Sequence, residues 1–189
     1  MRHFLLLIGS MLCAACASPT VADYRDQKPV FVLEEFFDGP LIAKGALYDR
    51  SGNLIRRFVA DIRGTWQGDQ GELAEVFWWA DGEEQLRTWK IARTQGNTFE
   101  GTAGDIVGLA VGEGAGNAFN WSYLLEVPVG ERKLNVRMDD WIYLIDESTV
   151  LNRTEMTFFG FHVGEVVLTI QKVNESQLYG RSPFAAKAP

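Results

Sequence analysis

The feature that most constrains the fold is a succession of extended runs separated by short turns. Turn sequences such as "RSGN" at 50–53, "DGE" at 81–83 and "QGN" at 95–97 interrupt the chain at short intervals. A parallel crossover needs about a dozen residues or more, so these connections require antiparallel neighbours. The sequence therefore predicts an all-β, up-and-down antiparallel meander of roughly eight to ten strands. The expected strands are residues 41–49, 54–66, 72–79, 84–93, 98–107, 118–127, 132–145, 150–159 and 161–172.

A meander of this length must protect its edge strands, and closure into a barrel removes those edges. Alternation supports a barrel with an apolar inside. In residues 117–127 one face is apolar, which places four side chains inside the expected barrel: Phe119, Trp121, Tyr123 and Leu125. Residues 132–144 and 54–66 carry similar rows, and the second row ends at Trp66. Only residues 31–39 are expected to form a helical turn or two.

A membrane-spanning barrel has the same alternation, but its lipid-facing side needs an apolar band on every strand. Residues 84–93 instead carry charge on both faces, with Glu84 and Lys90 on one face and Arg87 and Arg93 on the other. We therefore expect a barrel that does not span the membrane.

The N-terminal segment has the pattern of a secretory signal peptide. Arg2 precedes a short apolar run, Phe4–Leu12, and small residues follow it. The run is too short for a permanent membrane-spanning helix. Its end resembles the lipobox of bacterial lipoproteins, which predicts that residues 1–15 are removed and that acyl chains attach to Cys16.

Cys13 departs from the lipobox pattern, which usually has Leu three residues before the cysteine. Ordinary cleavage before Ser18 is therefore the alternative. A disulfide between the two cysteines is not expected, because Cys13 lies in the segment that either kind of cleavage removes. Ala17 differs from the Asp associated with inner-membrane retention. We therefore expect the acyl chains on Cys16 to hold the protein at the outer membrane of a bacterial envelope, facing the periplasm.

Charge and periodicity define the remaining organisation. The chain has a formal charge of −7, and loss of residues 1–15 removes one basic residue and no acidic residue. Such an acidic chain gives no reason to expect nucleic-acid binding. Residues 16–29 lack periodicity and are expected to form the anchor and a flexible tether. Residues 30–173 would form one barrel domain, and residues 174–189 a C-terminal tail.

A set of segments across nearly the whole expected domain is shared with a known family. They are "FFDGP" (36–40), "YDRSGNLIRRF" (48–58), "GTWQGDQGELAEVF" (64–77), "GTAGDIVGLAVGE" (101–113), "GNAFNW" (116–121), "DDWIYL" (139–144) and "NRTEMTFFGFHVGEV" (152–166). Through them the chain resembles a bacterial lipoprotein family known as domain-of-unknown-function family 3833 and regarded as lipocalin-like. The resemblance implies a lipocalin-like barrel and a lipid anchor. It implies no activity, substrate or catalytic residue.

The motifs of common enzyme classes are not recognisable. "GEGAGN" at 112–117 precedes an alternating strand rather than a helix, so we interpret it as a glycine-rich turn or bulge and not as a nucleotide loop. After Cys16 is acylated, His162 is the one remaining His or Cys of the mature chain, which leaves zinc sites and Ser-His-Asp triads without enough partners. His162 is in phase with an apolar row and is expected in the barrel wall. We expect no cofactor, no metal and no enzymatic activity.

Asp140 is a polar exception within an apolar row, since it alternates with Met138 and Ile142. Burial of an unpaired carboxylate is costly, so the group should be protonated or paired. The candidate partners are Arg57, Arg87, Arg153 and the amide of Asn152. Asp140 either forms a structural ion pair or caps the end of the barrel, or it fixes the polar head of an amphiphile that lies along the aromatic wall. A third role, as a general acid or base, needs a second positioned group that the sequence does not identify.

Aromatic residues are more numerous than a small core requires, and they either fill the barrel or line a pocket. They are Trp66, Phe77, Trp78, Trp79, Trp89, Phe119, Trp121, Tyr123, Trp141 and Tyr143. A barrel of more than eight strands has room for a ligand. We therefore expect a hydrophobic or amphiphilic small molecule, such as a lipid, to contact Trp66, Phe119, Trp121, Tyr123, Asp140, Arg57 and Arg153. The alternative is a filled barrel that serves as a structural or partner-binding envelope domain.

Overall fold

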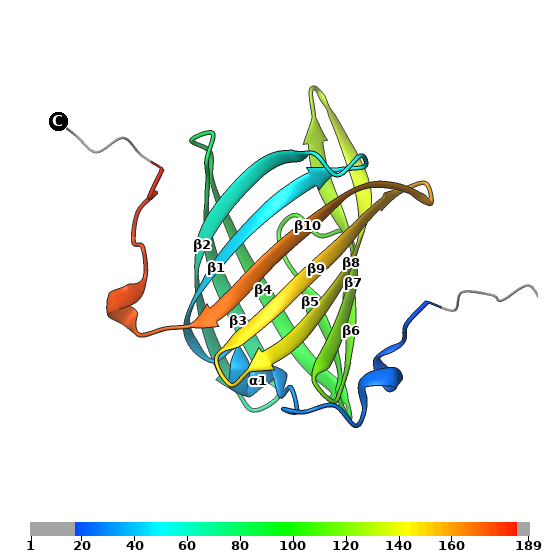
Figure 1. Cartoon of the computed structure of the whole chain (residues 1–189), viewed down its shortest axis with the longest axis vertical. Coiled ribbons are helices and arrows are strands. Elements are labelled where there is room, and N and C mark those ends of the chain that lie inside the picture. The colour runs from blue at the N-terminus through cyan, green and yellow to red at the C-terminus, as the bar shows by residue number, and fades with distance from the viewer. Residues whose placement is uncertain (1–17, 185–189) are drawn as a thin grey trace, which may run out of the picture.

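In the computed structural model, which describes residues 18–184, ten strands form one closed antiparallel barrel (Figure 1). The strands are β1 (Gly39–Asp49), β2 (Leu54–Gln67), β3 (Gln70–Trp79), β4 (Glu84–Gln95), β5 (Thr98–Thr102), β6 (Ala110–Ala115), β7 (Ala118–Val129), β8 (Arg132–Asp146), β9 (Thr149–Phe158) and β10 (Phe161–Lys172). Each strand pairs with the next along the chain, and β10 pairs with β1. The predicted all-β meander and its closure are confirmed.

Strand β6 corrects the sequence analysis, because it contains most of the segment that we interpreted as a turn. Gly112 to Ala115 pair with β7, and Gly112 and Glu113 also pair with β5 on the other side. The turn itself consists of Gly116 and Asn117. The strand predicted at 98–107 correspondingly ends at Thr102. Glycine is depleted in strands, so composition alone favoured a turn here.

The glycines of the barrel make room for large rings on neighbouring strands. Gly112 lies directly opposite Trp121, and a Cβ added to it would lie 2.1 Å from the indole ring. The same arrangement recurs in three other cross-strand pairs: Gly45 with Phe58, Gly71 with Trp66, and Gly114 with Phe119. Glycine in these strands therefore permits a close approach of ring and backbone.

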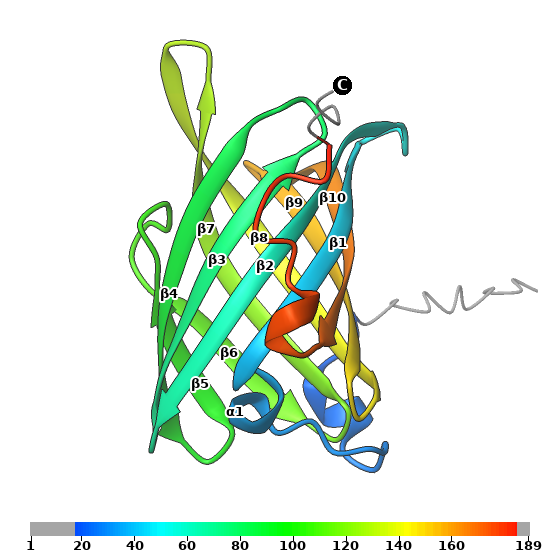
Figure 2. The ribbon, with the colours of Figure 1, turned by 90° about the vertical axis from the view of Figure 1, so that its left-hand side faces the viewer.

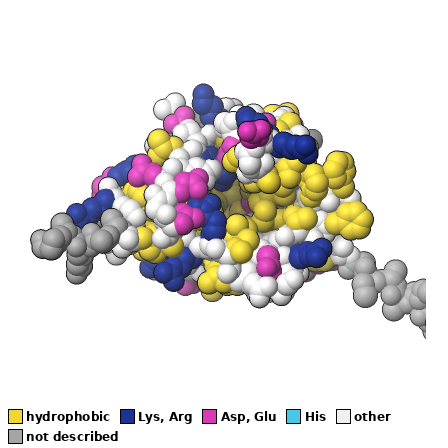
Figure 3. Space-filling view, turned by 90° about the horizontal axis from the view of Figure 1, so that it is seen from above, with side chains coloured by type: hydrophobic (Ala, Val, Ile, Leu, Met, Phe, Trp, Pro, Cys, Tyr) yellow, Lys and Arg dark blue, Asp and Glu magenta, His cyan; other side chains and the backbone are white. Residues whose placement is uncertain are grey.

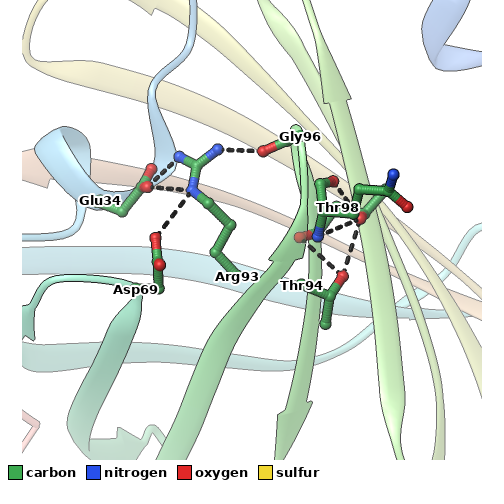
Figure 4. A network of polar contacts seen from close by, with 7 residues as sticks. Glu34, Asp69, Arg93, Thr94, Gly96 and Thr98 are labelled. Carbon is green, nitrogen blue, oxygen red and sulfur yellow. Dashed lines mark hydrogen bonds and ion pairs between the residues drawn. The ribbon is translucent and has the colours of Figure 1, made fainter.

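One end of the barrel is closed by the segment Phe31–Phe37, which we call the floor. It contains the helical turn α1 (Leu33–Phe36), in agreement with the sequence, and its Phe and Leu side chains are buried in the core. Arg93 of β4 binds Glu34 through its Nε atom at 2.7 Å (Figure 4). From the other side, the Nζ atom of Lys172 donates to three backbone carbonyls, of Glu35, Phe36 and Asp38, at 2.6–3.2 Å. The three Lys172 hydrogen bonds satisfy backbone carbonyls at the end of α1 that would otherwise lack a partner.

Strands β5 and β6 end well below the open end of the barrel, beside the longer β4 and β7 (Figure 2). The loop 103–109 covers this part of the wall. Its Ile106 forms a β-bridge with Leu125, and the carbonyl of Asp105 accepts the backbone N–H of Glu126 at 2.8 Å. The backbone pairing of this loop with β7 therefore holds Asp105 at the inner surface of the barrel.

The segments that flank the barrel pack on its outer wall. The 3-10 turn η1 (Val21–Tyr24) places the ring of Tyr24 against Trp141 of β8. After β10, the chain passes through η2 (Glu175–Gln177), and the backbone N–H groups of Tyr179 and Gly180 donate to buried Asp61. Parts of the predicted tether and tail therefore have fixed positions against the barrel.

The predicted anchor cannot be followed in this structure. Cys13 and Cys16 lie outside the described residues. Within residues 18–184, no helix has both the length and the apolar character that a membrane crossing requires.

Candidate ligand-binding cavity

The barrel encloses a cavity of about 460 Å³ that opens at the end opposite the floor (Figure 3). Aromatic side chains supply much of its wall: Phe58, Phe77, Trp79, Trp89, Phe119, Trp121 and Tyr123. The predicted inward row of β7 is confirmed, since Phe119, Trp121 and Tyr123 are buried and Leu125 also lines the cavity. The rings therefore surround an open interior and do not fill it.

Other aromatic residues of the predicted set have different positions. Trp66 lies beside the floor, where its Nε1 atom donates to the carbonyl of Phe37 at 3.3 Å, and it does not line the cavity. Trp141 and Tyr143 stack on the outside of β8, with an angle of 14° between their rings.

Two of the three arginines named as candidate partners of Asp140, Arg57 and Arg153, do not face it. Arg57 follows the cavity-lining Arg56 in β2, so its side chain points to the outer surface. Arg153 binds Glu165 on the outer wall, with 2.6 Å between its Nη2 atom and Oε2. The prediction that Arg57 and Arg153 face the interior is wrong, because both occupy the outward phase of their strands.

His162 lies in the barrel wall, as expected, but it does not continue the apolar row of β10. A β-bulge between His162 and Gly164 shifts the register of β10 against β9. His162 consequently leaves the inward row that begins at Gly164, and its Nδ1 atom lies 3.5 Å from Glu155 at the surface.

Asp140 does lie inside, within a group that we call the polar cluster: Glu75, Arg87, Asp105, Tyr123 and Asp140. These residues come from β3, β4, the loop 103–109, β7 and β8. Arg87 binds Asp105 with both its Nη2 and Nε atoms, at 2.6 and 3.0 Å from Oδ2. The Nη1 atom of Arg87 lies 4.0 Å from Oε2 of Glu75. Arg87, one of the candidate partners, is thus mainly engaged by Asp105.

Asp140 receives a hydrogen bond from Tyr123, whose Oη atom lies 3.1 Å from Oδ2. Asn152, the other candidate partner, directs its amide to the carbonyl of Trp141 at 3.4 Å. Among the described residues, Oδ1 of Asp140 and Oε2 of Glu75 are buried without a hydrogen-bond partner. Neither oxygen accepts a hydrogen bond from the described residues, and the one further contact is the 4.0 Å ion pair of Oε2 of Glu75 with Arg87.

A comparison with known families identifies the family of this chain. Residues 10–172 match the family described as "Protein of unknown function (DUF3833)". The chain belongs to this family. No curated protein matches the chain.

In this DUF3833 barrel, burial has the largest effect on the pKa values of Glu75 and Asp140. It raises the pKa of Glu75 to about 7, although Arg87 acts in the opposite direction. Burial likewise raises the pKa of Asp140 to about 6, against the effect of the Thr154 and Tyr123 hydroxyls. The pKa of Arg87 is lowered by burial but raised more by Glu75 and Asp105 together, so its guanidinium stays charged. Near neutral pH the cluster thus combines one cation with carboxylates of differing protonation.

Metal binding has no support in the described residues. Residues 18–184 contain no group of three or more His, Cys, Asp or Glu side chains arranged to hold a metal ion.

Two residues of the polar cluster, Glu75 and Asp105, are not among the site residues expected from the sequence. Glu75 alternates with Leu73 and Phe77, which line the cavity, so the two-residue period of β3 would have been enough to predict an inward position for Glu75. Asp105 lies in a loop, where no such period exists. Its position depends on the pairing of its loop with β7.

Proposed function

We propose that this DUF3833 protein binds an apolar or amphiphilic small molecule, such as a lipid, inside its barrel. The observation that carries this proposal is an aromatic-lined cavity of about 460 Å³ with its polar groups gathered on one part of the wall. Ligand sites of roughly 300–1,000 Å³ are typically apolar with a few convergent polar groups. Burial of the tail would contribute about 25 cal/mol per Å² of apolar area, and the polar cluster would fix the head.

We further propose that acyl chains on Cys16 anchor the protein to the outer membrane, with the barrel in the periplasm. The signal-peptide pattern and the lipobox-like end of residues 1–15 support this proposal. An extended chain spans at most about 3.5 Å per residue, so the short segment from Cys16 to Val21 would keep η1 close to the membrane. Because η1 contacts β6 and β7 on the side of the barrel near the floor, the mouth would open away from the membrane (Figure 1).

Binding of the neutral apolar dye N-phenyl-1-naphthylamine tests the proposed cavity function. Trp121→Ser should weaken dye binding markedly, because it removes a buried ring from the wall. Trp141→Ser is the matched control, since it makes the same change on the outer face and should leave the affinity unchanged. Both variants must retain cooperative melting and the native near-ultraviolet dichroism. Equal affinity in the two variants would show that the dye binds elsewhere.

A second candidate function is the binding of a protein partner, and an exposed aromatic tip favours it. Phe159 and Phe161, in the hairpin between β9 and β10, are 86% and 75% exposed. Exposed rings in this number at one turn often mark an interaction surface. If the wild-type barrel binds neither dye nor lipid, and loss of both rings abolishes a specific protein contact, this second function takes precedence.

A further inference from the structure

We infer that the cavity selects an amphiphile whose head group donates hydrogen bonds and carries no negative charge. A long-chain amine or alcohol would fit, whereas a fatty-acid carboxylate would not. The inference rests on the proposed function and concerns the polar cluster alone.

The charge balance of the polar cluster is the first reason. It contains three carboxyl groups, those of Glu75, Asp105 and Asp140, and one guanidinium. The guanidinium of Arg87 is engaged by both oxygens of Asp105 at 3.0–3.1 Å from its Nε atom. An incoming carboxylate would have to compete with Asp105 for this cation while lying near two further carboxyl groups.

The hydrogen-bond inventory is the second reason. Oε2 of Glu75 and Oδ1 of Asp140 are buried acceptors without a partner among the described residues. Two nearby donors are already used, since the Tyr123 hydroxyl binds Asp140 and the Asn152 amide binds a backbone carbonyl. A buried acceptor without a hydrogen bond is costly, and a ligand that donates a hydrogen bond would recover this cost.

One unpartnered donor also lines the cavity, the Nε1 atom of Trp79. Trp79 is the last residue of β3, at the mouth, where the guanidinium of Arg56 lies 3.9 Å from its ring centroid. Arg56 is itself bound to Asp81 and Glu83. Among the cavity-lining residues that the structure describes, the cation at the mouth is therefore already paired and does not offer a carboxylate an alternative to the polar cluster.

Apolar side chains surround the polar cluster toward both ends of the cavity. Toward the floor the wall contains Ile62, Leu73, Ile91, Phe119, Ile142 and Ile170, and toward the mouth it contains Leu47, Phe58, Phe77, Val127 and Val166. A single polar head beside an alkyl tail matches this distribution.

Three ligands with the same alkyl chain test the inference: dodecylamine, dodecanol and laurate. Displacement of N-phenyl-1-naphthylamine from the folded wild-type protein at pH 8 gives their relative affinities. We expect dodecylamine to bind most tightly. Laurate should bind at least about tenfold more weakly than dodecanol, because repulsion strong enough to shift a pKa by one unit changes an equilibrium constant tenfold.

The pH dependence gives a second readout. Glu75 faces Arg87, Asp105, Tyr123 and Asp140, and it ionises as the pH rises from 5.5 to 8, as does Asp140. Dodecylamine should therefore bind more tightly over this range and laurate more weakly. Dodecanol should change little, which controls for a general effect of pH on the barrel.

Glu75→Gln and Asp140→Asn should each reduce the preference for the amine over laurate by several-fold, because each removes one negative charge from the cluster. Asp139→Asn is the matched control. It makes the same carboxylate-to-amide change next to Asp140, but its side chain binds Asn120 on the other face of the sheet, so the preference should persist.

The outcomes separate the inference from the proposed function. Laurate that binds as tightly as dodecanol at pH 8 would overturn the inference and leave the cavity function standing. If none of the three ligands displaces the dye and the dye itself does not bind, the proposed function fails and the inference fails with it.

Discussion

Glu75 and Asp140 hold their carboxyl groups in a setting that favours the neutral form. Burial raises the pKa of Glu75 from 4.5 to about 7 and that of Asp140 from 3.8 to about 6. The folded state therefore binds more protons than the unfolded state between these values. The empty barrel should be most stable at mildly acidic pH, and a ligand that donates hydrogen bonds should offset part of the loss at higher pH.

The stability of the wild-type protein should fall as the pH rises from about 4.5 to about 7. The sign follows because a raised carboxyl pKa gives stability that is present below the unfolded-state value and is lost as the pH rises through the folded-state value. Glu75→Gln should remove about half of this slope, because Asp140 contributes a similar share. The variant should match the wild type near pH 4.5 and exceed its free energy of unfolding at pH 8 by up to about 3 kcal/mol.

Urea unfolding at a series of pH values measures this difference. Asp139→Asn serves as the control, since it should retain the slope of the wild type. A Glu75→Gln variant that is less stable than the wild type at pH 8 would show that the ionised carboxylate stabilises the barrel.

At this scale, strand period predicted much of the interior, including Trp121 and Asp140. Arg57 was chosen for its charge, although its phase in β2 opposes that of inward Phe58. His162 could not be placed from the period, because the bulge in β10 adds a residue on one strand and reverses the phase beyond it.

At the scale of the strands, close packing requires glycine on one strand opposite an aromatic ring on the next. Gly112→Ala should lower the free energy of unfolding by about 1–3 kcal/mol, because the new Cβ would overlap the ring of Trp121. Thermal unfolding measures the effect. Gly104→Ala is the control, since an added Cβ there has no neighbour within 4 Å. Equal melting temperatures for the two variants would contradict this packing.

The hairpin between β9 and β10 has a different feature. Phe159 adopts a φ of +48°, and Gly160 follows with a φ of +81°. Turns with two positive φ values favour Asn-Gly, so Phe159→Asn should stabilise the protein by about 1 kcal/mol. Phe161→Asn, which also removes an exposed ring, should give no such gain. If Phe159→Asn destabilises the hairpin, the Phe159 ring must form contacts that favour the strained backbone.

Most strands could be predicted because each connection is short and marked by turn residues. The exception is the region 98–117, where the wall is made by two short strands and a loop. The reason for glycine in β6 is the ring of Trp121 on the neighbouring strand, and a pairing between strands is not visible in the composition of either one.

At the scale of the whole molecule, the proposed anchor gives a direct prediction. Cys16→Ser should release the protein from the membrane fraction into the soluble periplasm, because serine cannot carry the thioether-linked lipid. Cys13→Ser should leave attachment unchanged, since it lies in the segment removed with the signal peptide. Fractionation of cells followed by immunoblotting measures both. Membrane attachment of Cys16→Ser would contradict the lipobox interpretation.

The barrel and its closure could be predicted from antiparallel connections and the need to protect edges. The sequence did not predict that the floor covers one end, or that Arg93 and Lys172 hold it there. Both contacts join residues far apart in the chain, and no local pattern encodes them. The same holds for the polar cluster, whose five residues come from separate elements.

Native mass spectrometry of the wild-type protein, released from the cells that produce it without added lipid, tests the central claim most directly. We predict one non-covalent amphiphile per barrel, released by organic solvent and lost in Trp121→Ser but not in Trp141→Ser. A wild-type protein that carries no such molecule, and that also fails to take up dodecylamine or dodecanol, would contradict a ligand-binding barrel.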